Sequence, residues 1–247
     1  MPIVEKNEIE RKPKNLIERF RKLDTPQISD GLGRISRVLG ERAQISYEIR
    51  QLIPNTKISG SAITCKNHSG SYLPSCRAVM IAKEGDVIVM DTHGNTGGAC
   101  WGGFISKEAR NRGVEGLVTD GVIRDIDEIR EVNFPVFARG IVAYAGAYAV
   151  AERINVPIQC CGTLVTPGDI IVADDNGVVA VPKEKAELVL KFAEAKARKE
   201  EKWMEDYKSK KISFCELWDI DNLWEEAKKV ADKEYGFGQN QNRRNDS

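Results

Sequence analysis

The chain has little of the chemistry that marks a structural metal site or a nucleotide-phosphate site. Its 247 residues include only two histidines and six cysteines, and no two cysteines have the CxxC spacing of paired zinc ligands. A GxGxxG dinucleotide fingerprint and a P-loop ending in GK[ST] are both missing. The sequence therefore predicts neither a structural zinc site nor a nucleotide site of these two common types.

The sequence also lacks an excess of charge and a long apolar run. Lys and Arg number 37 and so do Asp and Glu, which gives a formal net charge of zero. This balance offers no overall attraction to nucleic acid or to an anionic membrane. No stretch reaches the roughly 18 apolar residues of a membrane span, and the first residues contain no apolar core of signal-peptide length. We expect a cytoplasmic protein with free thiols and with no nucleic-acid or membrane partner.

The length suits one large domain or two small ones. A polar start with a short amphipathic helix precedes a central domain, and two charged helices and a polar tail follow it. The sequence thus predicts four regions, namely an N-terminal extension (1–24), a central domain (25–190), a C-terminal helical extension (191–235) and a disordered tail (236–247).

Within the central region, buried strands alternate with helices. We expect helices at 28–38, 73–85 and 99–113, and strands at 61–66, 86–91 and 114–121. Thr25 is the expected cap of the first helix, with Pro26 in its first turn, and Gly85 is the expected stop of the second. A strand-rich half follows, in which Asp174 and Asp175 make a tight turn. This order predicts an α/β domain with a mixed sheet.

Two loops each follow a buried strand that ends in an acid. Ligands of open α/β sheets bind outside the carboxyl ends of the strands. The loop at 92–105 is rich in glycine and leads into a helix, so its backbone N–H groups could bind an anion. The alternative is that these glycines only serve tight turns.

The second loop presents Arg124 and Asp125 side by side. A guanidinium offers a planar fork of donors to a carboxylate or an enolate oxygen. An aspartate is a hard oxygen ligand for Mg²⁺ or Mn²⁺, directly or through water. The alternative is an ordinary ion pair at the start of a helix.

Weaker candidates lie nearby. Asp91 ends its strand beside the glycine-rich loop and either lines the site or bonds to that loop. His93 is a potential proton shuttle near neutral pH, or a solvated loop residue. Cys160 and Cys161 lie in a strand-like stretch, where buried packing is the ordinary role.

The runs at 85–91, 99–125 and 168–182 resemble, in order and spacing, the family of the regulator of ribonuclease activity A. This family also contains 4-hydroxy-4-methyl-2-oxoglutarate aldolases, and the similarity covers roughly residues 25–190. The resemblance implies an α/β, αββα-type fold related to swivelling phosphohistidine domains, with added N- and C-terminal helices. It also implies assembly into a homotrimer or homohexamer.

For the site, the resemblance implies that Arg124 is catalytic and contacts a bound 2-oxo acid. It implies that Asp125 holds Mg²⁺ or Mn²⁺, largely through water. The substrate carboxylate is then received by backbone amides of the loop residues Gly102, Gly103, Phe104 and Ile105.

One position departs from the aldolase pattern. The aldolases carry an aspartate twenty-one positions before the arginine, where this chain has Gly103, which cannot transfer a proton. We expect His93 or a residue of a neighbouring subunit to take that role.

The expected activity is a metal-dependent lyase that releases pyruvate by retro-aldol cleavage of a 4-hydroxy-2-oxo acid, by decarboxylation of oxaloacetate, or both. The alternative is a non-catalytic regulatory binding protein of the ribonuclease-inhibitor type. The motif of that branch lacks the aspartate after the arginine, so Asp125 favours the enzyme.

Overall fold

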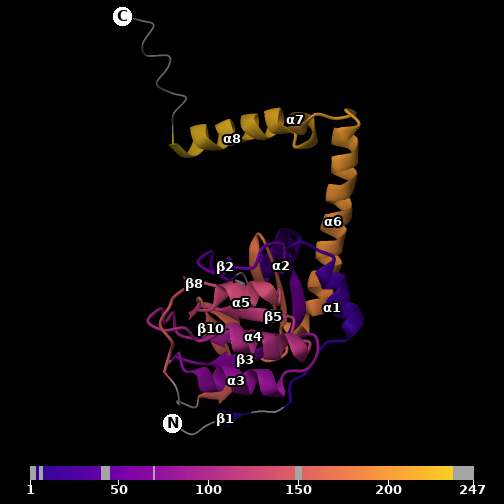
Figure 1. The fold of residues 1–247 in the computed structure, drawn as a ribbon. Coiled ribbons are helices and arrows are strands. Elements are labelled where there is room, and N and C mark those ends of the chain that lie inside the picture. Colours follow the sequence, from indigo (N-terminus) through magenta and orange to yellow (C-terminus); the bar gives the residue numbers. More distant parts are fainter. Residues whose placement is uncertain (1–3, 6–7, 40–44, 69, 148–151, 236–247) are drawn as a thin grey trace, which may run out of the picture. The chain divides into compact units, whose positions relative to one another are not determined.

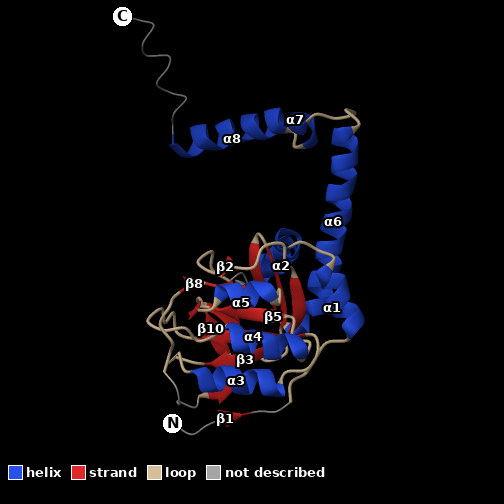
Figure 2. Cartoon of the chain, in the orientation of Figure 1, coloured by secondary structure: helices blue, strands red, loops and turns tan. Residues whose placement is uncertain are grey.

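A mixed sheet of nine strands forms the centre of the protein (Figures 1 and 2). The structure is a computed structural model that describes residues 4–5, 8–39, 45–68, 70–147 and 152–235. The chain forms two compact units, residues 1–196 and 197–247. The sheet belongs to the first unit, and so do all the residues predicted for the site.

The sheet has one continuous path and one branch. The branch starts at β3. The first half of β3 pairs antiparallel with β12, and the end of β3 pairs antiparallel with β9. The path runs in the order β1 (Val4–Glu5), β9 (Arg153–Ile154), β3 (Ile58–Lys66), β4 (Asp86–Asp91), β5 (Gly116–Thr119), β7 (Val136–Ala138) and β2 (Arg50–Gln51), and the branch holds β12 (Ile170–Asp174) and β13 (Gly177–Val181).

The four central strands β3, β4, β5 and β7 are parallel. Their pairing places Lys66 of β3 beside Asp91 of β4, so the carboxyl ends of these two strands meet at the same edge. The predicted mixed sheet is therefore confirmed, and the strand predicted at 86–91 has the bounds of β4. Loops that leave this edge are positioned to build a site.

Apolar residues alternate between the two faces of the sheet, as the period of a strand requires. In β4, Ile88 and Met90 belong to one core cluster, whereas Val87 and Val89 belong to the other. Because both faces are covered, these strands read as nearly continuous apolar runs.

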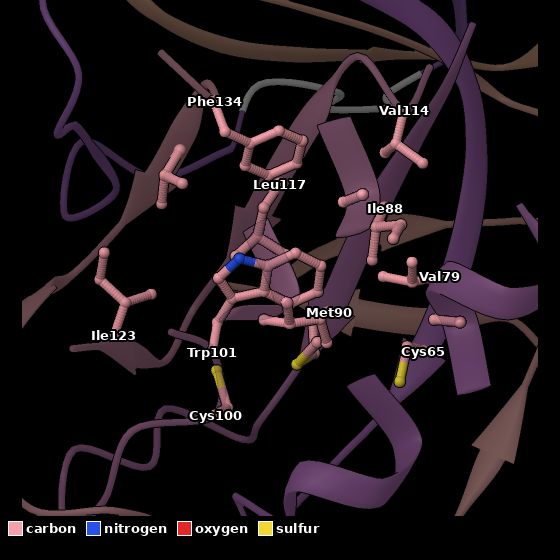
Figure 3. Close-up of a cluster of buried hydrophobic side chains, with 14 of the residues drawn as sticks. Cys65, Val79, Ile88, Met90, Cys100, Trp101, Val114, Leu117, Ile123 and Phe134 are labelled. Atoms are coloured by element: carbon pink, nitrogen blue, oxygen red, sulfur yellow. The ribbon is translucent and has the colours of Figure 1, made fainter. Parts of the chain in front are cut away.

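The first cluster is built around Trp101 (Figure 3). Its ring stacks on Phe134, with centroids 5.9 Å apart, and its indole N–H donates to Ser106 Oγ at 2.8 Å. Burial of this large side chain together with its polar atom fixes the segment that leads into the glycine-rich helix start.

Helices α3, α4 and α5 lie one beside the next over the face of the sheet that carries Trp101 (Figure 1). The small hairpin β10–β11 and a short pair β6–β8 lie outside the main sheet. The bounds of these and the other elements of the first unit are α1 (Lys14–Arg21), α2 (Thr25–Leu39), α3 (Tyr72–Ile81), α4 (Gly103–Asn111), β6 (Val122–Ile123), α5 (Ile126–Glu131), β8 (Gly140–Ile141), β10 (Ile158–Cys160), β11 (Thr163–Val165) and a 3₁₀ turn (Lys183–Lys185).

Two predicted helix ends were wrong. Thr25 is the first residue of α2 rather than its cap, and its hydroxyl donates instead to the buried Asp174 carboxylate at 2.6 Å. Helix α3 ends at Ile81 because Ala82 is extended, so Gly85 lies beyond the helix. Gly85 has φ +87° and serves the turn before β4.

Helix α6 (Ala186–Lys208) continues from the first unit into the second. The second of the two charged helices that the sequence predicts after the central domain is divided into α7 (Phe214–Leu217) and α8 (Ile220–Tyr235). The division falls at Asp219, which has φ +49°. The predicted disordered tail, 236–247, lies outside the described residues.

No helix in the described part of the chain is long and apolar enough to cross a membrane. The six cysteines are all free.

Candidate functional site

The two predicted loops meet at the start of α4. A β-bridge joins Trp101 to Ile123, and Arg124 N–H donates to the Trp101 carbonyl at 3.1 Å. This pairing sets Gly102 and Gly103 directly beside the residues that follow Ile123. The structure thus brings together the glycines and the charged pair that the sequence predicted for the site.

Gly102 leaves room for the Asp125 carboxylate. A Cβ there would lie 2.7 Å from Asp125 Oδ2, so the carboxylate would have to move away from the helix start. Gly102 is the N-cap of α4 and supplies no side-chain capping bond. The first N–H groups of a helix have no partner within it, so this helix start can receive an anionic group.

The carboxylate of Asp125 already binds one of these N–H groups. Its Oδ2 atom accepts the Gly103 N–H at 3.3 Å and lies 3.2 Å from Arg124 Nε. Asp125 has φ +56°, a left-handed conformation that is uncommon outside glycine. This turn folds the carboxylate back toward the helix start while leaving the Arg124 and Asp125 side chains 44% and 36% exposed.

The other two residues of the predicted carboxylate loop have different surroundings. The Phe104 side chain is 81% exposed, whereas Ile105 is buried in the first core cluster. The predicted role requires only their backbone N–H groups, and these lie in the first turn of α4. Ile105 anchors that turn to the core.

Glu128 is a neighbour that the sequence reasoning missed. An ideal Cβ built on Gly103 would lie 2.6 Å from both the Cβ and the Oε2 of Glu128. The Glu128 carboxylate therefore occupies the space that a side chain at position 103 would need. Its Oε2 atom also accepts a hydrogen bond from Lys107 Nζ at 2.8 Å, and this hydrogen bond raises the pKa of Lys107.

The sequence carried no local signal for Glu128, because its carboxylate reaches Gly103 only through the packing of α5 against α4. Asp125 and Glu128 together place two carboxylates around the Gly102–Gly103 backbone. Hard oxygen donors of this kind suit Mg²⁺ or Mn²⁺, with water completing the shell.

His93 lies elsewhere. Its N–H donates to Asp91 Oδ1 at 2.9 Å, and its ring lies 5.0 Å from that of His68. Asp91 therefore does bond to the glycine-rich loop, which was one of its two predicted roles. Among the described residues, His93 therefore contacts Asp91 and His68 rather than Gly103. The carboxylate beside Gly103, where the aldolases carry their aspartate, is that of Glu128.

The cysteines beside these strands are poor nucleophiles. Burial raises the pKa of Cys100 to about 12, and it also raises the pKa of Cys65 and Cys160 well above the ordinary value. Cys160 packs in the second core cluster, as predicted, and Cys161 makes the turn after β10 with φ +46°. A thiolate mechanism is not supported at this edge.

A cavity of about 400 Å³ lies at the opposite end of β4. Its charged lining is largely paired internally, because Arg11 binds Asp86 in two hydrogen bonds and Arg21 binds Glu115. We assign no chemistry to it.

Comparison with known proteins places this geometry in context. Residues 25–180 match the model of the RraA-like family, described as Aldolase/RraA. The chain is 37% identical over 187 residues to a protein of Halalkalibacterium halodurans named as a candidate 4-hydroxy-4-methyl-2-oxoglutarate aldolase, covering 76% of this chain and 86% of that one. It is 30% identical over 99 residues to the 4-hydroxy-4-methyl-2-oxoglutarate aldolase of Thermus thermophilus, covering 40% and 60%.

Among solved structures, RraAS2 of Streptomyces coelicolor superimposes with a TM-score of 0.69 at 25% identity. The match covers 81% of this chain and 99% of that one. RraAS2 is described as an unusual member of the RNase ES inhibitor RraA protein family. The predicted fold class is thereby confirmed.

Proposed function

The chain belongs to the RraA-like family, and from that premise we propose that it is a divalent-metal-dependent lyase acting on 2-oxo acids. The reaction is retro-aldol cleavage of a 4-hydroxy-2-oxo acid, with oxaloacetate decarboxylation as a second outcome of the same site. One observation carries the proposal: Arg124 and Asp125 lie against the glycine start of α4, with Asp125 Oδ2 3.3 Å from the Gly103 nitrogen. The relatives named as aldolases support it.

Each group then has a role that follows from its chemistry. The N–H groups at the start of α4 receive the substrate carboxylate, those of Phe104 and Ile105 directly and that of Gly103 once the Asp125 carboxylate releases it. The Arg124 guanidinium binds the 2-oxo oxygen and stabilises the negative charge that develops on it when the carbon–carbon bond breaks. Asp125 would hold Mg²⁺ or Mn²⁺, with water completing the shell, and the bound ion would supply Lewis-acid polarisation of the substrate.

Glu128 is the group we assign to proton transfer. Retro-aldol cleavage removes a proton from the 4-hydroxyl and later returns one to the pyruvate enolate. The Glu128 carboxylate fills the space beside Gly103 and is half exposed, so a bound substrate could reach it. A positioned general acid–base group of this kind contributes about 10²–10⁴-fold to rate.

A second candidate function is regulatory binding without catalysis. The similarity to RraAS2, a member of a ribonuclease-inhibitor family by its description, supports this alternative. An inhibitor needs a complementary surface but does not need Asp125 or Glu128 as reacting groups. Substitution of Asp125 therefore separates the two functions.

The test is pyruvate release from 4-hydroxy-2-oxo acids and from oxaloacetate. Activity should disappear in excess EDTA and return when Mg²⁺ or Mn²⁺ is added. Asp125→Asn should lack activity with either metal, while Asp127→Asn, an exposed neighbour on α5, should retain it. Undiminished turnover in EDTA would exclude the metal-dependent mechanism.

A further inference from the structure

The two histidines of the chain lie together at the edge where β3 and β4 end. Lys66, the last residue of β3, pairs with Asp91, the last residue of β4. His68 follows Lys66 by two residues, and His93 follows Asp91 by two residues. Adjacent parallel strands thus deliver two imidazoles and one carboxylate to the same point.

The donor atoms of His68, Asp91 and His93 all lie within 4.8 Å of one another. His68 Nε2 lies 3.3 Å from Asp91 Oδ2, and the rings of His68 and His93 are tilted with centroids 5.0 Å apart. A divalent ion held by imidazole nitrogen and carboxylate oxygen has bonds of about 2.0–2.2 Å. Its ligand atoms therefore lie on the order of 3–4 Å apart, so small side-chain rotations would complete the shell.

The loop that carries His93 is fixed by buried carboxylates. Asp91 is 3% exposed, and its Oδ1 accepts the His93 N–H at 2.9 Å. Asp120, at the end of the next strand and also 3% exposed, accepts the N–H groups of Thr92 at 2.6 Å and Gly94 at 3.0 Å. Three consecutive N–H groups are thus held by two acids.

This anchoring holds His93 in a left-handed conformation, φ +57°, which costs about 1–2 kcal/mol for an L-residue. The Gln159 N–H approaches Asp91 Oδ2 at 3.4 Å and adds a further orienting contact. In metal sites, supporting contacts of this kind hold the residues that bind the metal in a fixed orientation.

We propose that His68, Asp91 and His93 form a second divalent-metal site, separate from Asp125, that selects ions with affinity for imidazole. Two nitrogens and one oxygen favour Zn²⁺, Co²⁺ or Ni²⁺, whereas the carboxylate of Asp125 with water suits Mg²⁺ or Mn²⁺. Three protein ligands leave a coordination position for water or for an anionic molecule. The site is open to solvent on the histidine side, since His68 and His93 are both exposed.

The experiment uses untagged, metal-free, full-length protein titrated with Zn²⁺ by calorimetry. Wild type should bind one equivalent at this site, and His68→Ala and His93→Ala should each weaken that binding by at least about 10-fold, the lower end of the effect of losing even an outer-shell partner. Both side chains are exposed, so neither change should affect folding, which circular dichroism verifies. Asp125→Asn should leave this Zn²⁺ binding intact.

The imidazole signals give an independent readout, because the chain has no other histidine. Added Zn²⁺ should shift the ring resonances of both residues in nuclear magnetic resonance spectra. A Cys215→Ser background removes the exposed thiol as a competing ligand. Unchanged Zn²⁺ affinity in both histidine variants, ring signals that do not move, or loss of binding only in Asp125→Asn would each overturn the proposal.

Discussion

Arg124 is placed so that its shape matters as much as its charge. The guanidinium already shares Asp125 Oδ2 through Nε and has further donors in the same plane. Arg124→Lys keeps the charge but loses this fork. By analogy with removal of one oxyanion donor, we expect kcat to fall by about 10²–10³-fold. Steady-state kinetics of pyruvate release measure it.

Arg130→Lys is the matched control, because Arg130 lies on α5, the helix that follows Arg124, and pairs at the surface with Asp127. It should retain full activity. If Arg124→Lys behaves like this control, Arg124 is a structural residue and the proposed role is wrong.

Gly103 and Glu128 compete for one space, which permits an exchange experiment. Glu128→Ala should lower retro-aldol cleavage by about 10²–10⁴-fold and lower oxaloacetate decarboxylation less, because decarboxylation needs no base to begin. Adding Gly103→Asp to a Glu128→Gly background should restore part of the cleavage, because only glycine at position 128 removes the Cβ that would lie 2.6 Å from a Cβ at position 103. The ratio of the two activities is the measurement.

Gly103→Asp alone should perturb the site, because its Cβ would lie 2.6 Å from the Cβ of Glu128. Glu131→Gln, also exposed on α5, is the control for charge loss. The ion pair between Glu128 and Lys107 is half exposed and is worth little to stability. An unchanged activity ratio in Glu128→Ala would remove Glu128 from the proton path.

At the scale of elements, the carboxylate of Asp174 joins the start of α2 to the turn between β12 and β13. Burial alone would raise the pKa of Asp174, but hydrogen bonds from Thr25 and Asn176 outweigh burial and hold the pKa below its ordinary value. A depressed pKa in the folded state adds stability above the unfolded pKa of about 3.9, and that stability is lost as pH falls through the folded pKa.

Thr25→Val removes the hydroxyl that donates to Asp174 at 2.6 Å. We expect a loss of about 1.5–3 kcal/mol in the free energy of unfolding near neutral pH, the range for a hydrogen bond to a charged group. The difference from wild type should shrink once the pH falls below about 3.9. Urea unfolding at both pH values measures it, and Thr25→Ser should resemble wild type. A pH-independent difference would contradict the charge-based explanation.

The elements also show what the sequence could predict. An unbroken apolar run bounded by Asp86 and Asp91 leaves a strand little freedom, and its ends were predicted correctly. Helix ends depend on tertiary partners instead. Thr25 has the composition of a cap, yet its hydroxyl serves Asp174, 149 residues away in the chain. No local pattern contains that contact.

The site divides in the same way. Arg124, Asp125 and the glycines follow from motif spacing, because each lies just beyond a recognisable strand. Glu128 was missed because only the close packing of α5 against α4 brings its carboxylate to Gly103. The meeting of His68 with His93 required the parallel pairing of β3 and β4, which alternation along one strand does not specify.

At the scale of the whole molecule, we expect a homotrimer or homohexamer, in line with the resemblance noted in the sequence. Helix α8 carries exposed apolar side chains at Ile220, Leu223, Trp224 and Val230, a spacing that gathers them on one side of the helix. Exposed apolar stripes of this kind mark contact surfaces. Light scattering of the full-length chain should give a mass of three or six subunits, and a stable, active monomer at micromolar concentration would contradict the expectation.

Trp224→Glu tests whether that stripe takes part in assembly. If it does, the charge should lower the mass measured by light scattering, while Lys229→Glu on the same exposed helix should leave it unchanged. Equal masses for both variants would show that α8 does not hold the subunits together.

The four tryptophans divide between the two units in a way that separates their optical signals. Trp101 is enclosed in the core of the first unit at 1% exposure, while Trp203, Trp218 and Trp224 belong to the second unit, where the latter two are 45% and 64% exposed. An enclosed indole emits at shorter wavelengths than a hydrated one. Replacing the three second-unit tryptophans with phenylalanine leaves a single fluorophore that adjoins Gly102, so its emission would report events at the helix start without any attached dye.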